Sequence, residues 1–169
     1  GNGARIWQIL AECDEEHVPA VYWVALSWGA LVNLQNDDPE WLADLSRVKK
    51  LMAWVRKKQP HYQNGGPNLF YGVINTAIPK QLGGKPEEAK AGFEAAIAST
   101  EGRYLMAKAL FARKYMPAVN NRAGYKRLLT EVIDAPVDIM KSQRLANQIA
   151  KKRATRWLAE IDELFDDEE

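Results

Sequence analysis

Residues 48–60 read VKKLMAWVRKKQP, and their spacing indicates the architecture of the whole chain. Apolar side chains recur at steps of four and three, at Val48, Met52 and Val55, and Pro60 follows five residues later. Residues three and four apart lie on one face of an α-helix. The spacing therefore predicts a helix that buries one face and ends before the proline, which cannot continue it.

The same steps recur twice further along the chain. The second copy is Ala89, Phe93, Ala96 and Glu101, with Glu in place of the proline. The third is Tyr125, Leu129, Val132 and Pro136, with the proline one position early. The copies start at residues 48, 89 and 125, so they are 41 and 36 residues apart, near the 34 of a tetratricopeptide repeat. We predict an all-α fold of degenerate tetratricopeptide-like helical hairpin repeats in a curved stack. A generic helical bundle is the alternative, because such steps occur there too.

Caps, turns and apolar periodicity predict about eight helices in a single helical-repeat domain over residues 1–169. The expected helices cover 4–14, 19–34, 40–57, 68–78, 87–99, 103–116, 122–133 and 142–165. Asp38 is the predicted N-cap of the third helix, with Pro39 in its first turn, and Ser142 is the predicted N-cap of the last. Residues 64–67 (NGGP) are predicted to form a loop, and residues 83–86 (GGKP) a turn.

In stacks of this kind the first helix of each pair lines the concave face. The register then points inward Trp23, Leu26, Ala30 and Asn33, then Tyr71, Ile74, Ile78 and Gln81, then Met106, Leu110 and Arg113. This predicted lining is mainly apolar with a few polar ends. It suits a small hydrophobic ligand or a partner helix. The alternative is that these side chains form ordinary core between helices.

Composition excludes several functional classes. The 23 basic and 22 acidic residues leave a net charge of +1, so we expect no binding of nucleic acid and no general attraction to anionic lipid. The longest apolar stretch, residues 18–34, is interrupted by Ser27 and Gly29 and predicts no membrane span. One cysteine, Cys13, excludes an internal disulfide, and we expect it to be a helical residue that faces the protein core.

No catalytic or metal-binding constellation is visible. His17 and His61 have no second ligand type at zinc spacing, and the glycine-rich turns lack the phosphate-binding ending. Carboxylates occur in runs, such as residues 14–16 and 166–169, that are typical of solvated surface. We predict no enzyme activity, no cofactor and no metal. A site assembled from distant residues is the alternative.

The last predicted helix has an unusual order of charges. Its first part has only bases, namely Lys141, Arg144, Lys151, Lys152, Arg153 and Arg156, and the acids Glu160, Asp162 and Glu163 follow. This order opposes the helix dipole, which favours acids early and bases late. Two interpretations remain open: solvated faces with intramolecular ion pairs, or a docking surface.

Three strings, in this order, resemble a known family. They are VYWVALSWGA at 21–30, LGGKPEEAK at 82–90 with FEAA at 93–96, and LAN at 145–147 with RA at 153–154 and WL at 157–158. Together they resemble the T-component of TRAP-type transporters, the TRAP-associated tetratricopeptide-repeat proteins. The matched positions are Tyr22, Trp28, Gly83, Gly84, Phe93, Asn147, Arg153 and Trp157. The pair Ala91-Gly92 departs from the family, which has bulkier residues there.

The resemblance implies a non-catalytic periplasmic accessory protein. Its partners would be a TRAP-type periplasmic substrate-binding protein, a small hydrophobic solute and two further copies in a homotrimer. A parent protein with a lipoprotein leader and additional N-terminal helices is also implied, and the membrane would be reached only through that lipid anchor.

Most of the matched positions are expected to be structural. Gly83 or Gly84 would supply a positive φ, Phe93 and Trp157 would fill the core, and Asn147 and Arg153 would be buried and hydrogen-bonded. A general tetratricopeptide-like scaffold that binds peptides or proteins is the alternative function.

Overall fold

The computed structural model describes residues 2–34, 41–78 and 84–165 of the chain. Within these ranges every regular element is a helix and none is a strand, which confirms the predicted all-α class. Two compact units make up the chain, Gly1–Gln63 and Asn64–Glu169. The association of both units into a single repeat domain stays a prediction, and the predicted cap at Asp38 and Pro39 lies outside the described residues.

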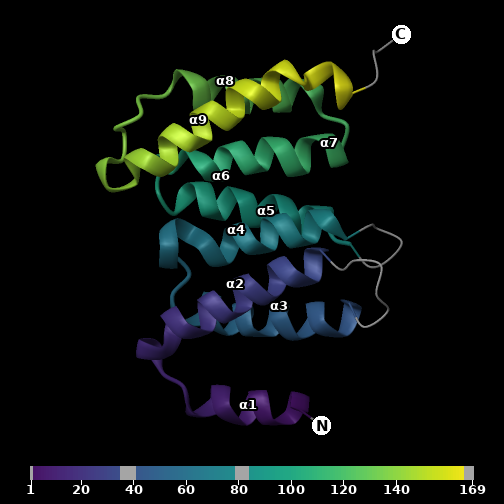
Figure 1. Ribbon diagram of the computed structural model, residues 1–169, viewed down its shortest axis with the longest axis vertical. Coiled ribbons are helices and arrows are strands. Elements are labelled where there is room, and N and C mark those ends of the chain that lie inside the picture. The colour runs from purple at the N-terminus through teal and green to yellow at the C-terminus, as the bar shows by residue number, and fades with distance from the viewer. Residues whose placement is uncertain (1, 35–40, 79–83, 166–169) are drawn as a thin grey trace. The chain divides into compact units, whose positions relative to one another are not determined.

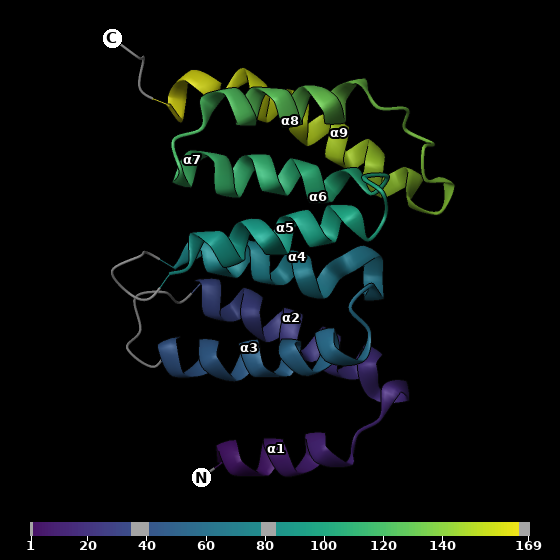
Figure 2. The same cartoon turned by 180° about the vertical axis from the view of Figure 1, so that it is seen from behind.

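The first unit is built around a helical hairpin. Its elements are α1 (Asn2–Glu12), η1 (Glu15–His17), α2 (Val18–Leu34) and α3 (Trp41–Lys58). Helices α2 and α3 lie side by side in both views (Figures 1 and 2). The side chains that form its core are Val18, Tyr22, Ala25, Val32, Leu45, Val48, Leu51, Met52 and Val55.

The second unit continues as layered helices. Its elements are α4 (Tyr62–Ala77, which contains the boundary), α5 (Pro86–Ala98), α6 (Leu105–Leu110), η3 (Phe111–Tyr115), α7 (Met116–Ala118), α8 (Arg122–Asp134), η4 (Lys141–Gln143), α9 (Arg144–Ala159) and η5 (Ile161–Glu163). Helix α6 contacts α5 on one side and α8 and α9 on the other. Figure 1 shows α8 and α9 packed together at the end of this unit.

The repeated apolar triplets have one property in common. Val48, Met52, Val55, Ala89, Phe93, Ala96, Tyr125, Leu129 and Val132 all have an exposed fraction of 0%. The steps of four and three therefore identified the buried face of α3, α5 and α8, and this part of the prediction is confirmed. The tetratricopeptide-like geometry of the hairpins stays a prediction.

The predicted loop at 64–67 is wrong, because α4 already begins at Tyr62. Its first turn is left-handed, with φ of 48° at Gln63, 59° at Asn64 and 81° at Gly65. Asparagine and glycine adopt this conformation at little cost, so residues that signal a loop here form the start of a helix. The positive φ expected at Gly83 or Gly84 stays a prediction, because Gly83 lies outside the described residues and the φ angle of Gly84 depends on it.

The helix predicted at 103–116 is interrupted near its end. Helix α6 passes into η3, a π-helical turn, before α7 continues to Ala118. Pro117 has no N–H to donate, and its ring crowds the carbonyl group four residues earlier, at Arg113. We attribute the wider π turn at residues 111–115 to this proline.

The last predicted helix is divided into three. Ser142 lies inside the η4 turn, where Gln143 N–H donates to Met140 O at 2.9 Å, and α9 starts only at Arg144. The expected N-cap role of Ser142 is therefore wrong, because the short turn places it before the helix start. Helix α9 ends at Ala159, and η5 follows.

Asn147 on α9 is hydrogen-bonded to backbone groups at the start of α6. Its side chain is fully buried; Oδ1 accepts from Leu105 N–H at 3.0 Å and Nδ2 donates to Arg103 O at 3.0 Å. The N-cap residue of α6, Tyr104, makes no side-chain cap. Asn147 therefore caps α6 from another helix, since it satisfies a backbone group that a helix end leaves free. Its predicted burial and hydrogen bonding are confirmed.

Substitution of Asn147 by leucine should lower the free energy of unfolding by about 2–4 kcal/mol, because one buried and one part-buried backbone group lose their partners. Asn147→Asp should cost a comparable amount, since a carboxylate cannot donate to Arg103 O. Urea unfolding followed by circular dichroism measures both. The exposed neighbour Gln148→Leu serves as control and should change stability by less than about 0.5 kcal/mol. A stable Asn147→Leu variant would contradict the capping role.

Helices α4 and α5 approach each other closely where two glycines meet. A Cβ atom built on Gly92 would lie 2.7 Å from Gly72 N and 2.9 Å from Asn68 O. A Cβ atom on Gly72 would lie 2.8 Å from the Phe93 ring. The departure of this chain from the family pattern at Gly92 therefore has a structural reason: only a residue without a side chain lets the two backbones come this close.

Replacement of Gly92 by alanine should destabilise the protein by about 1–3 kcal/mol, although alanine is the better helix former. The new methyl group would meet backbone atoms, which cannot rotate away as a side chain does. Thermal unfolding measures the loss. The adjacent exposed residue provides the control, since Ala91→Ser should leave the melting temperature nearly unchanged. An unchanged or higher melting temperature for Gly92→Ala would exclude the close approach.

Candidate functional site

An apolar stripe on α2 is exposed in the first unit. It consists of Trp23, Val24 and Leu31, which are 51%, 56% and 59% exposed, with the exposed Ser27 and Ala30 between them. We call these five residues the α2 stripe. Large apolar side chains occur singly on most protein surfaces, whereas several on one helix face mark a surface that contacts something else.

The sequence of α2 explains why this stripe exists. Apolar residues surround the helix on all sides, in VPAVYWVALSWGALVNL, whereas a surface helix of a globular protein normally has one apolar and one polar face. Tyr22, Ala25 and Val32 are buried on the side that packs in the hairpin. The other side has apolar residues as well, and in this structure they remain exposed.

Trp23 has a fixed position on that surface. Its ring meets the buried Tyr22 ring edge to face, at 5.2 Å between centroids, and Tyr22 contacts Tyr62 in the same way at 5.1 Å. Edge-to-face pairs of this kind stabilise one ring orientation. A tryptophan that is held in place yet half exposed loses little entropy when a partner covers it, which is typical of interface anchors.

The predicted groove residues of the first unit are partly accessible. Trp23 and Ala30 are exposed and Leu26 is half-buried on the same helix. The side chain of Asn33, like Gln81, lies outside the described residues. The structure thus brings Trp23, Leu26 and Ala30 together on α2.

The predicted groove residues of the second unit are less accessible. Tyr71, Ile74 and Ile78 are 8%, 5% and 9% exposed, and Met106 and Leu110 pack half-buried against the core cluster. As they stand, these five side chains offer little surface to a ligand. Their role in a groove stays a prediction.

Arg113, the polar member of the predicted lining, interacts with other side chains of the second unit. Its Nη1 donates to Tyr125 Oη at 3.3 Å, its Nη2 lies 3.5 Å from Glu160 Oε2, and its guanidinium lies 5.7 Å from the Trp157 ring centre. Tyr125 Oη in turn donates to Trp157 O at 2.9 Å. Burial raises the pKa of Tyr125 and Arg113 partly opposes this, so the phenol stays protonated at neutral pH.

The positions that match the family strings are mostly structural. Phe93 and Trp157 are 0% and 8% exposed, which confirms their place in the core, and Tyr22 is buried. Trp28 is half-buried. The expected burial of Arg153 is wrong: its side chain is exposed, and its Nη1 donates a weak hydrogen bond to Met106 Sδ at 4.0 Å. A long arginine side chain can extend from the edge of a buried face to solvent.

A cleft between α1 and α3 in the first unit was not anticipated from the sequence. It has a volume of about 580 Å³ and is lined by Trp7, Leu10, Ala11, Cys13, Glu15, Lys50, Trp54, Lys57 and Lys58. Lys50 Nζ lies 5.1 Å from the Trp7 ring centre and Lys58 Nζ lies 5.7 Å from that of Trp54. The prediction that Cys13 is a core-facing helical residue is wrong, because α1 ends at Glu12 and Cys13 is half-buried at this cleft. The sequence signal that could have indicated this cleft was the spacing of residues 50, 54, 57 and 58, which lie on one face of a helix.

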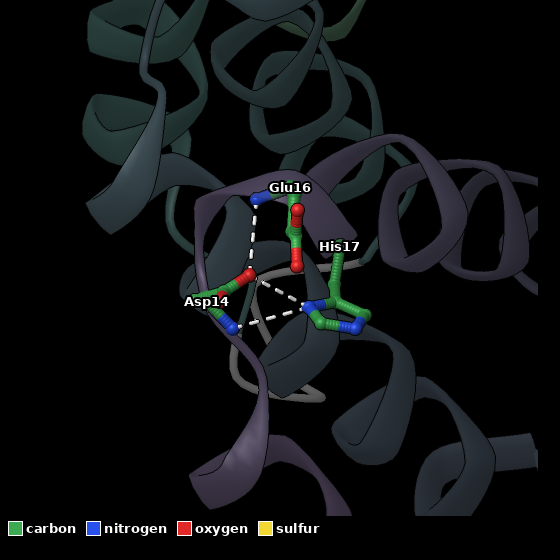
Figure 3. Close-up of side chains that lie close together, drawn as sticks. All are labelled: Asp14, Glu16 and His17. Atoms are coloured by element: carbon green, nitrogen blue, oxygen red, sulfur yellow. Dashed lines mark hydrogen bonds and ion pairs between the residues drawn. The ribbon is translucent and has the colours of Figure 1, made fainter.

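Asp14, Glu16 and His17 gather three potential metal-ligand atoms within 4.8 Å (Figure 3). The Asp14 carboxylate accepts from Glu16 N–H at 3.2 Å and lies 2.8 Å from His17 Nδ1, which is also 3.3 Å from Asp14 N. These contacts form a capping box on η1. The hydrogen bond with His17 lowers the pKa of Asp14. Capping explains the cluster without an ion, and all three residues are exposed.

The fold and these surfaces define an all-α protein of packed helical hairpins with an exposed apolar stripe. The family model of the TRAP transporter T-component matches residues 1–165, and the chain belongs to that family. A protein of Treponema pallidum (strain Nichols), described as an uncharacterized protein, is 23% identical over 166 residues. The match covers 98% of this chain and 51% of that relative, so the chain spans about half its length. No described helix is long and apolar enough to cross a membrane.

The exposure of Trp23 makes a testable difference to stability. Because the indole contributes little to the core, Trp23→Ala should lower the free energy of unfolding by about 1 kcal/mol, the size of one aromatic pair. Phe93→Ala, at a fully buried position, should lower it by about 3–5 kcal/mol. Chemical unfolding of both variants measures this, and equal losses would place Trp23 in the core.

Proposed function

We propose that this chain is part of a non-catalytic accessory component of a TRAP-type solute transporter. It acts in the periplasm, binds the cognate substrate-binding protein and takes part in the transfer of a small hydrophobic solute. The family match supports the link to the transporter. The α2 stripe supports a role in binding, because its exposed indole and aliphatic side chains gain free energy when a partner covers them.

The parent protein, in this proposal, is held at the membrane by a lipid anchor at its N-terminus. A homotrimer, as the family resemblance implies, would multiply the contacts with the transporter. The most direct test of the setting is export: the full-length gene product should be recovered from the periplasmic face of the membrane, labelled by a radioactive fatty acid. Recovery from the cytosol alone would contradict the proposed periplasmic location.

A second candidate function is a general scaffold for peptides or protein termini. The cleft between α1 and α3 favours it, since Lys50, Lys57 and Lys58 surround two indole rings there. Ammonium groups beside an apolar cleft suit a chain that ends in a carboxylate. Peptides with free and amidated C-termini distinguish the two functions: preference for the free form, without any binding of a substrate-binding protein, would favour the scaffold.

The proposed partner gives a quantitative prediction for Trp23. In isothermal titration of the full-length protein with the cognate substrate-binding protein, Trp23→Ala should weaken binding by about 2 kcal/mol, roughly 30-fold in Kd, with the fold retained. Val119→Ala removes another exposed aliphatic side chain (39% exposed) and should leave Kd unchanged. If the unmodified protein fails to bind the substrate-binding protein, the proposed function is wrong.

A further inference from the structure

Helix α9 has one buried face and one exposed face of unusual composition. Its buried face consists of Asn147, Ala150, Ala154 and Trp157, which pack in the core of the second unit. On the opposite side Leu145 is 72% exposed and Ile149 is 41% exposed. Lys152 and Arg156 continue the same row and are exposed as well.

These four exposed residues form a narrow row. They follow one another at steps of four, three and four, so at 100° per residue their directions fall within about 60°. We call Leu145, Ile149, Lys152 and Arg156 the α9 stripe. Next to it is a hollow of about 530 Å³, lined by Ile149, Lys152, Arg153, Thr155 and Arg156. The exposed face of α9 therefore offers aliphatic contact and positive charge in one place.

Intramolecular contacts account for only part of the positive charge. Lys151 Nζ donates to Ile133 O at 2.5 Å and also to Ala135 O, so it satisfies the end of α8. Arg156 Nε lies 3.7 Å from Glu160 Oε1. Among the residues that the structure describes, no carboxylate forms an ion pair with Lys141, Arg144 or Lys152.

Helix stability favours Arg156, which lies in the last turn of α9, but it does not explain the bases near the helix start. No acid occurs between Lys141 and Ala159, so the first turn of α9 has positive charge where the helix dipole favours negative charge. Each positive charge near the helix start therefore lowers helix stability slightly. Exposed aliphatic residues in the same row add no stability to the isolated chain. Binding to an oppositely charged partner would explain both the bases and the exposed aliphatic residues.

We infer that the α9 stripe is the surface on which this protein docks an acidic, partly apolar face of the substrate-binding protein. The charge complementarity selects a partner face rich in Asp and Glu, with an aliphatic or aromatic residue to cover Leu145 and Ile149. This inference rests on the proposed function, because the partner is the same protein. The α9 stripe lies on a different helix from the α2 stripe, and it contains charged residues, whereas the α2 stripe contains none.

Nucleic acid fits this surface less well than an acidic protein. Its row contains aliphatic rather than aromatic side chains, so it has no platform on which bases could stack. An anionic membrane would also attract these bases, but membrane-binding helices typically bury a broad apolar face and here only two aliphatic residues are exposed in the row. The experiment below separates the membrane from the protein partner.

The test is a charge reversal on the full-length protein. Lys152→Glu combined with Arg156→Glu should weaken binding of the cognate substrate-binding protein at least tenfold, mainly through slower association. Lys114→Glu combined with Lys126→Glu changes the net charge equally at exposed positions on η3 and α8, and should change Kd less than twofold. Leu145→Ser combined with Ile149→Ser should also weaken binding about tenfold, mainly through faster dissociation. Circular dichroism verifies that all variants are folded.

Each outcome has a distinct meaning. Tenfold weakening by the α9 variants but not by the control pair supports the inference, as does a drop in affinity of the unmodified protein between 0.05 and 0.5 M NaCl. Unchanged binding by both α9 variants overturns it and leaves the proposed function in place. No binding by the unmodified protein overturns both. Binding to phosphatidylglycerol vesicles that the charge reversal abolishes, with partner binding intact, would assign the surface to the membrane instead.

Discussion

Complete burial of one narrow face on α3, α5 and α8 is the constraint on which the structure depends. A helix of 13 to 18 residues is marginal in water on its own, so each of these elements persists because its apolar face is covered. Nine side chains at steps of four and three meet this requirement with no exposed surface. The candidate binding surfaces lie on other helices, on the exposed faces of α2 and α9.

The buried faces could be predicted from the sequence because both the residue type and its spacing follow from burial. Local departures from these regular patterns could not be predicted from the sequence. At residues 63–65 the same Asn-Gly signal that favours a loop also permits a left-handed first turn of a helix. Ser142 has the chemistry of an N-cap, yet a short 3₁₀ turn places it before the helix start. Arg153 lies at the edge of a buried face, where its long side chain reaches solvent.

The candidate site was only partly predictable, for a different reason. A groove and a core both require apolar residues on a helix, so periodicity cannot tell Trp23 from Ile74. Trp23 is half exposed and Ile74 is 5% exposed, and only the packing of neighbouring helices decides between them. The sequence of α2 does indicate an exposed apolar surface. The helix is apolar on every side, and a single neighbouring helix cannot cover all of these sides.

The two exposed stripes would contribute differently to the binding of a partner. In the proposed complex, apolar contact at Trp23 and Leu31 would slow dissociation, because separation returns that surface to water. Charge at Lys152 and Arg156 would act over about 8–10 Å in physiological salt and so orient a partner before contact. A component that must engage and release a partner repeatedly benefits from fast, oriented arrival with modest apolar contact. The composition of the α9 stripe, two aliphatic and two basic residues in one row, matches that requirement more closely than it matches the needs of a stable helix.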